Sequence, residues 1–232
     1  MSDLLVPARP LPLLPVLGGG RFPVARVFCI GRNYVEHAAE MGAEIDRDAP
    51  FYFTQQAFSV QPFGTSMAYP PRTADLHHEV EYVAALAAPL RNATAEEALA
   101  AVLAHGVGLD MTRRDLQAEA KARRRPWDTG KDFEGAAIFG PLALVGEGDL
   151  AQDRAIRLSV NGEVRQAARL SEMVWSLAEM LVDLSTLYHL QPGDIVMTGT
   201  PAGVGPVLPG DRLEAEVEGL PPLSVEIGPP VL

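Results

Sequence analysis

The chain has 232 residues, 47% of them hydrophobic, which suits one domain with a sizeable core. Its 30 acidic and 19 basic residues give a net charge of −11, which argues against a nucleic acid or an anionic membrane surface as its partner. Cys29 is the only cysteine, so an intrachain disulfide and a two-cysteine metal site are excluded, and a reducing cytoplasm is the expected location. An acidic chain that binds an anionic substrate must concentrate positive charge in its pocket, from a metal ion or a few Lys and Arg residues.

We expect residues 1–20 to form an N-terminal segment without the features of a signal peptide, and residues 21–232 to form a single domain. A capping box at Thr94 and Glu97 and the hairpin turn Asn161-Gly162 are the clearest local signals. In chain order the composition predicts a strand at 26–30, a helix at 35–41, a strand at 51–54, a loop at 59–73, a strand at 79–86, a helix at 94–103, a strand at 107–109, a helix at 112–125, strands at 142–145, 155–160 and 163–166, a helix at 173–190 and strands at 195–197, 212–217 and 223–227. Many strands and few helices favour a β-rich α+β fold, a barrel or paired sheets, over a doubly wound sheet.

Three carboxylates form the sharpest chemical signal. On a strand, Glu79 and Glu81 point to one face, about 7 Å apart at Cα. Such a pair most often marks a solvated strand face, but it also suits a hard cation such as Mg²⁺, Mn²⁺ or Ca²⁺. Asp110 follows an apolar strand, where an acid is costly unless it is paired, metal-bound or used as a helix N-cap. Together the three favour one divalent metal ion.

Two other segments carry weaker signals. His37 and Glu40 have i,i+3 spacing on a predicted helix, so the carboxylate can orient the imidazole as a general base for water, although an exposed helix gives the same pattern. Lys131 lies among aromatic residues in a loop suited to an anion, and the loop at 199–205 offers N–H groups and the Thr200 hydroxyl. The basic stretch 121–125 is predicted to be a solvated face or a subunit contact.

In order along the chain, five segments resemble the fumarylacetoacetate hydrolase family: FCIGRNYVEHAAEMG, DLHHEVEY, GVGLDMTRRDLQAEAKARRRPWDTGKDF, VNGEVRQ and LQPGDIVMTGTPAGVGPVLPGD. The resemblance spans about Arg26 to Asp211, and within the family it is nearest to the bacterial fumarylpyruvate hydrolases and acylpyruvases. It implies the family's β-rich roll or barrel of mixed sheet with a few flanking helices, a Mg²⁺ or Mn²⁺ cofactor, a small anionic 2-keto acid as substrate, and a homodimer.

The resemblance also implies roles for individual residues. These are metal ligation by Glu79, Glu81 and Asp110, water activation by His37 and Glu40 on a lid segment, contact with the reacting keto acid by Lys131 and Gln117, and binding of the substrate's carboxylate end by Arg32 and Thr200. The implied reaction is metal-dependent hydrolysis of a carbon–carbon bond in a 3-acylpyruvate, as in the degradation of aromatic compounds. The alternatives are an oxaloacetate decarboxylase or 2-keto acid tautomerase on the same scaffold, and a non-catalytic binder.

One segment departs from the family pattern. Family members usually carry Lys-Pro after the aromatic strand, whereas this chain has Gln55 and Gln56 after Thr54. A cationic side chain and a rigid proline are both absent at the edge of the predicted site, which leaves substrate choice and rate open.

Overall fold

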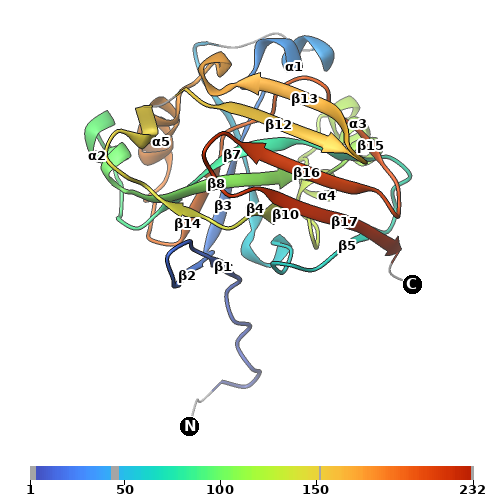
Figure 1. Cartoon of the computed structure of the whole chain (residues 1–232), viewed down its shortest axis with the longest axis horizontal. Helices are drawn as coiled ribbons and strands as arrows, with labels where there is room; N and C mark the ends of the chain where they lie inside the picture. Colours follow the sequence, from blue (N-terminus) through green and yellow to red (C-terminus); the bar gives the residue numbers. More distant parts are fainter. Residues whose placement is uncertain (1–3, 43–46, 152, 231–232) are drawn as a thin grey trace.

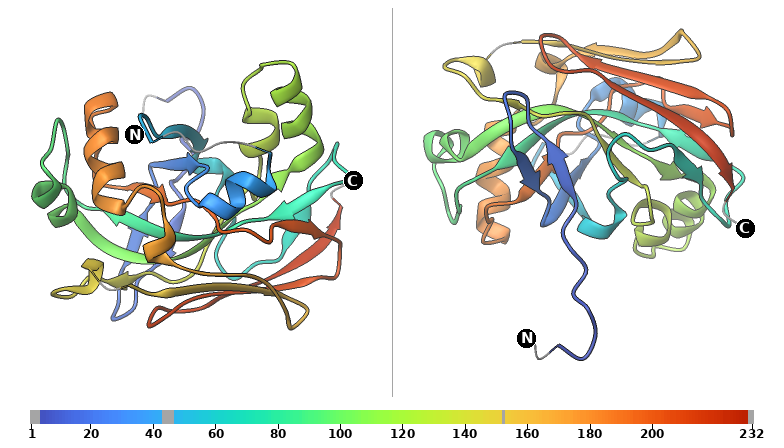
Figure 2. Two further views of the ribbon diagram at one scale, coloured as in Figure 1. Left: turned by 90° about the horizontal axis from the view of Figure 1, so that it is seen from above. Right: turned by 60° about the horizontal axis from the view of Figure 1, so that its bottom comes forward.

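The structure is a computed structural model that describes residues 4–42, 47–151 and 153–230. It confirms the β-rich α+β fold: a seven-stranded sheet curls into a half-barrel, and a five-stranded sheet packs across one of its faces (Figure 1). Helices α1, α3 and α5 lie on the side away from the five-stranded sheet (Figure 2). Among the described residues, none of the helices has the length and apolar content needed to cross a membrane.

The seven-stranded sheet has the order β10-β8-β7-β14-β3-β4, with β11 also paired to β8. All its pairings are antiparallel except that of β14 with β3. Its strands are β3 (Arg26–Gly31), β4 (Phe51–Gln56), β7 (Val80–Leu86), β8 (Val102–Asp110), β10 (Ala137–Phe139), β11 (Ala143–Leu144) and β14 (Asp194–Met197).

The five-stranded sheet has the order β13-β12-β16-β17-β5, and two smaller sheets complete the fold. Its strands are β5 (Met67–Tyr69), β12 (Ala155–Val160), β13 (Glu163–Arg169), β16 (Arg212–Val217) and β17 (Leu223–Pro230). The smaller sheets contain β1 (Leu13–Pro15) with β2 (Arg21–Pro23), and β6 (Leu76–His78) between β9 (Thr112–Arg113) and β15 (Gly205–Val207). The helices are α1 (Val35–Glu40), α2 (Ala95–Ala100), α3 (Arg114–Ala122), α4 (Asp128–Lys131) and α5 (Leu177–Leu187), with 3-10 turns η1 (Ala57–Ser59), η2 (Asp149–Ala151) and η3 (Leu170–Glu172).

Strand β7 is buried along its whole length and separates two apolar cores. Alternate side chains point to opposite faces of a strand. Tyr82 and Ala84 therefore join the core that includes the five-stranded sheet, whereas Val83 and Ala85 join a second core beneath β1 and β2. Glu81 shares the face of Val83, so its carboxylate lies at one end of the second core.

The structure corrects several predicted boundaries. The predicted loop 59–73 contains β5, whose pairing with distant β17 left no local signal. The helix predicted at 173–190 begins only at Leu177, because Ser176 and Glu179 form a capping box there. The helix predicted at 112–125 begins at Arg114, so Asp110 is not its N-cap.

Candidate metal and substrate site

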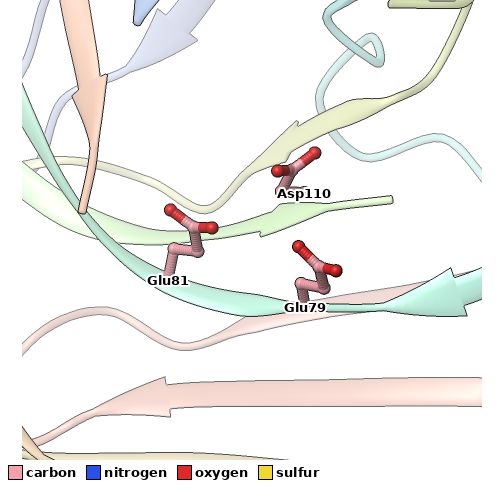
Figure 3. A group of neighbouring side chains, drawn as sticks. All are labelled: Glu79, Glu81 and Asp110. Carbon is pink, nitrogen blue, oxygen red and sulfur yellow. The ribbon is translucent and has the colours of Figure 1, made fainter. Parts of the chain in front are cut away.

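The three predicted ligands lie side by side on two neighbouring strands. Glu79 immediately precedes β7, Glu81 lies within it, and Asp110 is the last residue of β8. The Asp110 N–H donates to the Glu79 carbonyl at 2.9 Å, which fixes the register of the two strands. One carboxylate oxygen from each residue lies within 4.8 Å of the other two, and all three side chains project from the same side of the two strands (Figure 3).

Two cations accompany this triad. Lys131 Nζ lies 2.7 Å from Glu79 Oε2 and 2.7 Å from Asp110 Oδ2, and Arg114 Nη2 lies 2.5 Å from Glu79 Oε1. Burial opposes ionisation of Glu79, but Lys131 and Arg114 hold the pKa of its carboxyl below the usual value. Burial also lowers the pKa of a lysine, but Asp110 and Glu79 raise the pKa of Lys131 above its ordinary value. Glu79 is therefore ionised and Lys131 protonated.

Glu81 receives much less compensation. Its Oε2 accepts the Gly199 N–H at 2.7 Å, and it forms no ion pair within the described part of the chain. Burial, together with Asp110 and Glu79, raises the pKa of Glu81 well above its usual range. Burial also raises the pKa of Asp110 to about 6. Three buried carboxylates thus share two cations, and oxygen ligands in this arrangement fit an added divalent ion such as Mg²⁺ or Mn²⁺.

Residue 199 must be a glycine for its N–H to reach the Glu81 carboxylate. Its φ is +89°, and a Cβ atom here would lie 2.7 Å from the Cβ of Asn33. The loop can therefore approach Glu81 closely enough to donate its N–H only without a side chain.

The predicted general-base pair is formed on α1. His37 Nδ1 lies 3.3 Å from Glu40 Oε2, and the Gly203 N–H donates to the same carboxylate at 3.2 Å. His37 is 7% exposed, and burial lowers the pKa of its imidazole, so the ring is neutral near pH 7. When Nδ1 carries the proton for the bond to Glu40, Nε2 has a free lone pair for a substrate water.

Thr200 is oriented by a buried amide from β13. Gln166 Nε2 donates to Thr200 Oγ1 and to the Pro201 carbonyl, both at 2.8 Å, while Gln166 Oε1 accepts from His78 at 3.0 Å and from the Val80 N–H at 3.1 Å. The Val80 N–H can only donate, which fixes the orientation of the amide. Thr200 Oγ1 therefore accepts one bond, and its hydroxyl hydrogen stays available to donate to a bound anion.

Two further cations lie near the triad. Arg32, with φ of 62°, directly follows β3, and Lys121 lies on α3 with Nζ 4.8 Å from the Trp127 ring centroid. Neither forms a hydrogen bond or ion pair with another described residue. Burial, and then Arg114, lowers the pKa of Lys121 to about 8. The same pocket therefore contains the carboxylate triad and two cations that have no carboxylate partner among the described residues.

The structure brings eight of the nine predicted site residues to the lining of this one pocket: Arg32, His37, Glu79, Glu81, Asp110, Gln117, Lys131 and Thr200. The ninth, Glu40, contacts His37. Gln117 Oε1 accepts a 2.7 Å hydrogen bond from Arg114, which connects it to the triad through Glu79.

Sequence reasoning missed several residues of this site, including Arg114, which lines the pocket and pairs with Glu79. Lys121 was predicted to belong to a solvated or subunit-contact stretch, but it lines the pocket. The spacing of Gln117 and Lys121, i and i+4 on one helix, was the available signal. The sequence marks Gln55 only as a departure from the family pattern at the edge of the predicted site. In the structure its side chain donates a hydrogen bond to Asp110.

Comparison with known proteins supports an enzyme site. Residues 26–227 match the family described as fumarylacetoacetate (FAA) hydrolase, C-terminal. The chain is 41% identical to a fumarylpyruvate hydrolase of a Ralstonia species, over 82% of this chain and 99% of that protein. It is 35% identical to an oxaloacetate tautomerase of Escherichia coli K12, over 85% of this chain and 90% of the relative. The crystal structure of fumarylpyruvate hydrolase from Pseudomonas aeruginosa in complex with Mn²⁺ and pyruvate superposes with a TM-score of 0.94 at 40% identity, covering 97% of this chain and 99% of that one.

Proposed function

Because the chain belongs to the fumarylacetoacetate hydrolase family, we propose that it hydrolyses a carbon–carbon bond of a 3-acylpyruvate to give pyruvate and a carboxylic acid. The observation that carries this proposal is the meeting, in one pocket, of a buried carboxylate triad with a neutral His37 held by Glu40. The similarity to a fumarylpyruvate hydrolase supports the same reaction class.

The chain's own residues can activate the attacking water and stabilise the charge that develops during the reaction. A Mg²⁺ or Mn²⁺ ion held by Glu79, Glu81 and Asp110 would supply Lewis-acid polarisation of the substrate oxygens. His37 takes a proton from water through Nε2 while Glu40 stabilises the imidazolium, and the water oxygen bonds to the distal carbonyl carbon. The carbon–carbon bond then breaks, and its electron pair stays with the pyruvate fragment as an enolate, which takes up a proton.

Lys131 is placed to favour that bond cleavage. Its ammonium is held by Glu79 and Asp110, so its charge is fixed before the reaction begins. A preorganised charge beside developing negative charge lowers the barrier without having to reorganise. Gln117, which lines the same pocket, would contact the keto acid.

Two of the cations that line the pocket indicate the kind of acyl group. Arg32 and Lys121 have no carboxylate partner among the described residues, and the Thr200 hydroxyl can donate to an anion. Two such cations in the same pocket as a carboxylate triad suit a substrate that carries a second carboxylate. We propose a fumarylpyruvate-like dicarboxylate, supplied by the degradation of aromatic compounds.

The test is pyruvate release from fumarylpyruvate, acetylpyruvate and oxaloacetate, with Mg²⁺, with Mn²⁺ and with a strong chelator. We expect metal-dependent release that is fastest from fumarylpyruvate. Full activity in the chelator would contradict the metal site, and metal binding without turnover of any acylpyruvate would indicate a binding protein instead.

Oxaloacetate chemistry is the second candidate, because the chain is also similar to an oxaloacetate tautomerase. Tautomerisation and decarboxylation require the same triad but no attacking water. A chain that converts oxaloacetate equally well with and without His37, and does not release pyruvate from acylpyruvates, would have this second function.

We also propose that the protein forms a homodimer. The described residues before β1, 4–12, form an N-terminal arm. Large apolar side chains are exposed on and beside this arm, including Leu5, Leu11, Phe58 and Phe63. The arm extends away from the body of the chain (Figure 1). Size-exclusion chromatography with light scattering should give about twice the 24.9 kDa chain mass, and the monomer mass at micromolar concentration would contradict the dimer.

A further inference from the structure

The environment of Gln55 is unusual for a buried glutamine. Gln55 lies on β4 and is 2% exposed. Its Nε2 donates to Asp110 Oδ1 at 2.8 Å and to the Lys131 carbonyl at 2.7 Å. Its Oε1 is also buried, yet no described residue donates to it. The side chain thus makes two bonds toward the site and leaves its acceptor unpaired.

The two acceptors fix the orientation of this amide. If the amide were flipped, Oε1 would face the Asp110 carboxylate and the Lys131 carbonyl, and three acceptors would meet without a hydrogen. A buried polar atom without a partner is unfavourable and calls for a reason. The reason here is that both N–H groups are needed to hold Asp110 and the backbone that carries the Lys131 ammonium.

The Gln55 amide carries no charge, and this is as important as its position. Asp110 Oδ2 is held by the cationic Lys131 and Asp110 Oδ1 by the neutral Gln55, so both oxygens are oriented while only one cation is used. A lysine at position 55 would place a third cation beside the three carboxylates. It would then compete with a divalent ion for the same negative charge.

We propose that Gln55 is a positioning residue that aims Asp110 and Lys131 while keeping the triad anionic enough to bind a divalent cation tightly. This inference rests on the metal site of the proposed function. It assigns Gln55 no contact with the substrate. Groups that orient metal ligands commonly change metal affinity by about 10–100-fold when they are removed.

Gln56 provides a matched control on the same strand. Its backbone N–H and its Nε2 both donate to Asp132, each at 3.0 Å, and it is exposed. It therefore links β4 to the same segment as Gln55 does, but it touches no carboxylate of the triad.

The experiment is a titration of the full chain with Mn²⁺, in which electron paramagnetic resonance follows free and bound ion without any substrate. Gln55→Met removes the donor and adds no charge, whereas Gln55→Lys keeps a donor and adds a charge. We expect both to bind Mn²⁺ about 10–100-fold more weakly than the parent chain. Gln56→Met should bind like the parent. Bound Mn²⁺ should give an altered spectrum in Gln55→Met, because Asp110 is no longer held on both sides.

The outcomes separate this inference from the proposed function. Unchanged affinity in Gln55→Met overturns the positioning role, and unchanged or tighter binding in Gln55→Lys overturns the charge argument. If Gln55→Met does not fold, Gln55→Lys and the Gln56→Met control still decide the charge argument. No Mn²⁺ binding by the parent chain would overturn the metal site and this inference together, whereas metal-dependent pyruvate release with identical binding by all variants would overturn only the inference.

Discussion

The two halves of the pocket, the carboxylate triad and the pair His37 and Glu40, are held in place by different kinds of contact. The proposed metal ligands lie on adjacent strands, are at most 5% exposed and are held by Lys131, Arg114, Gln55 and the Gly199 N–H. The proposed general-base pair lies on α1, a six-residue helix whose N-cap, Tyr34, makes no side-chain capping bond. Helices of this length are not stable alone, so α1 depends on tertiary contacts such as Glu40 with Gly203. In the proposed mechanism, rigid strands fix the binding geometry, and the more weakly supported helix supplies the proton acceptor.

This contrast implies that the two halves can be disabled separately, and the largest effect is expected in the sheet. Glu81→Ala should abolish metal dependence and activity together, because it removes a ligand from a site that is already formed. The fold should survive, since the substitution also removes a buried carboxyl group whose ionisation is poorly compensated. Circular dichroism and pyruvate release with and without Mg²⁺ are the measurements, and full activity would remove Glu81 from the site.

The next largest effect is expected from the helix. His37→Ala should reduce hydrolysis by about 10²–10⁴-fold, the usual range for a lost general base. Mn²⁺ affinity and any oxaloacetate decarboxylation should barely change, because neither requires activation of water. Rates of both reactions at saturating Mg²⁺ would test this. An equal loss of both would mean that the segment closes over the substrate instead of activating water.

A smaller effect is expected at Lys121, which lines the same pocket. Lys121→Met should raise the KM for fumarylpyruvate by about 10-fold, the loss of one charge-assisted hydrogen bond of roughly 1.5 kcal/mol. The KM for acetylpyruvate, which lacks a second carboxylate, should not change and serves as the control. Equal changes for both substrates would contradict a role in recognising the acyl carboxylate.

The smallest effect is expected from Glu40→Gln, and it appears in the pH profile. Burial lowers the pKa of His37, whereas the hydrogen bond that its imidazole donates to Glu40 raises that pKa. A base acts while it is unprotonated, so activity is lost as the pH falls through the His37 pKa, below about 6.5. Removing the Glu40 charge should move this acid limb to lower pH and reduce the rate by less than His37→Ala does. An acid limb at higher pH in the variant would contradict the pairing.

The sequence predicted those parts of the site that depend on local spacing. Alternation on a strand placed Glu79 with Glu81, and helical spacing placed His37 with Glu40. The bond from Gln55 to Asp110 joins residues 55 positions apart, and that from Gln166 to Thr200 joins residues 34 apart, so no local pattern reports either. Strand β5 was missed for the same reason, because its partner lies at the other end of the chain.

The pairing of β7 with β8 also has a consequence for thermal stability. Asp110 lies opposite Glu79 only while the two strands are paired, and an unfolded chain offers three scattered carboxylates. An ion that binds only the folded chain stabilises it by mass action, by about 2.7 kcal/mol at 100 times its Kd. For a domain of this size each kcal/mol raises Tm by roughly 2–4 °C. The melting temperature of the chain should therefore rise with the concentration of Mn²⁺. Comparing the Tm of the chain in different divalent ions would then rank their affinities for this site before any substrate is known.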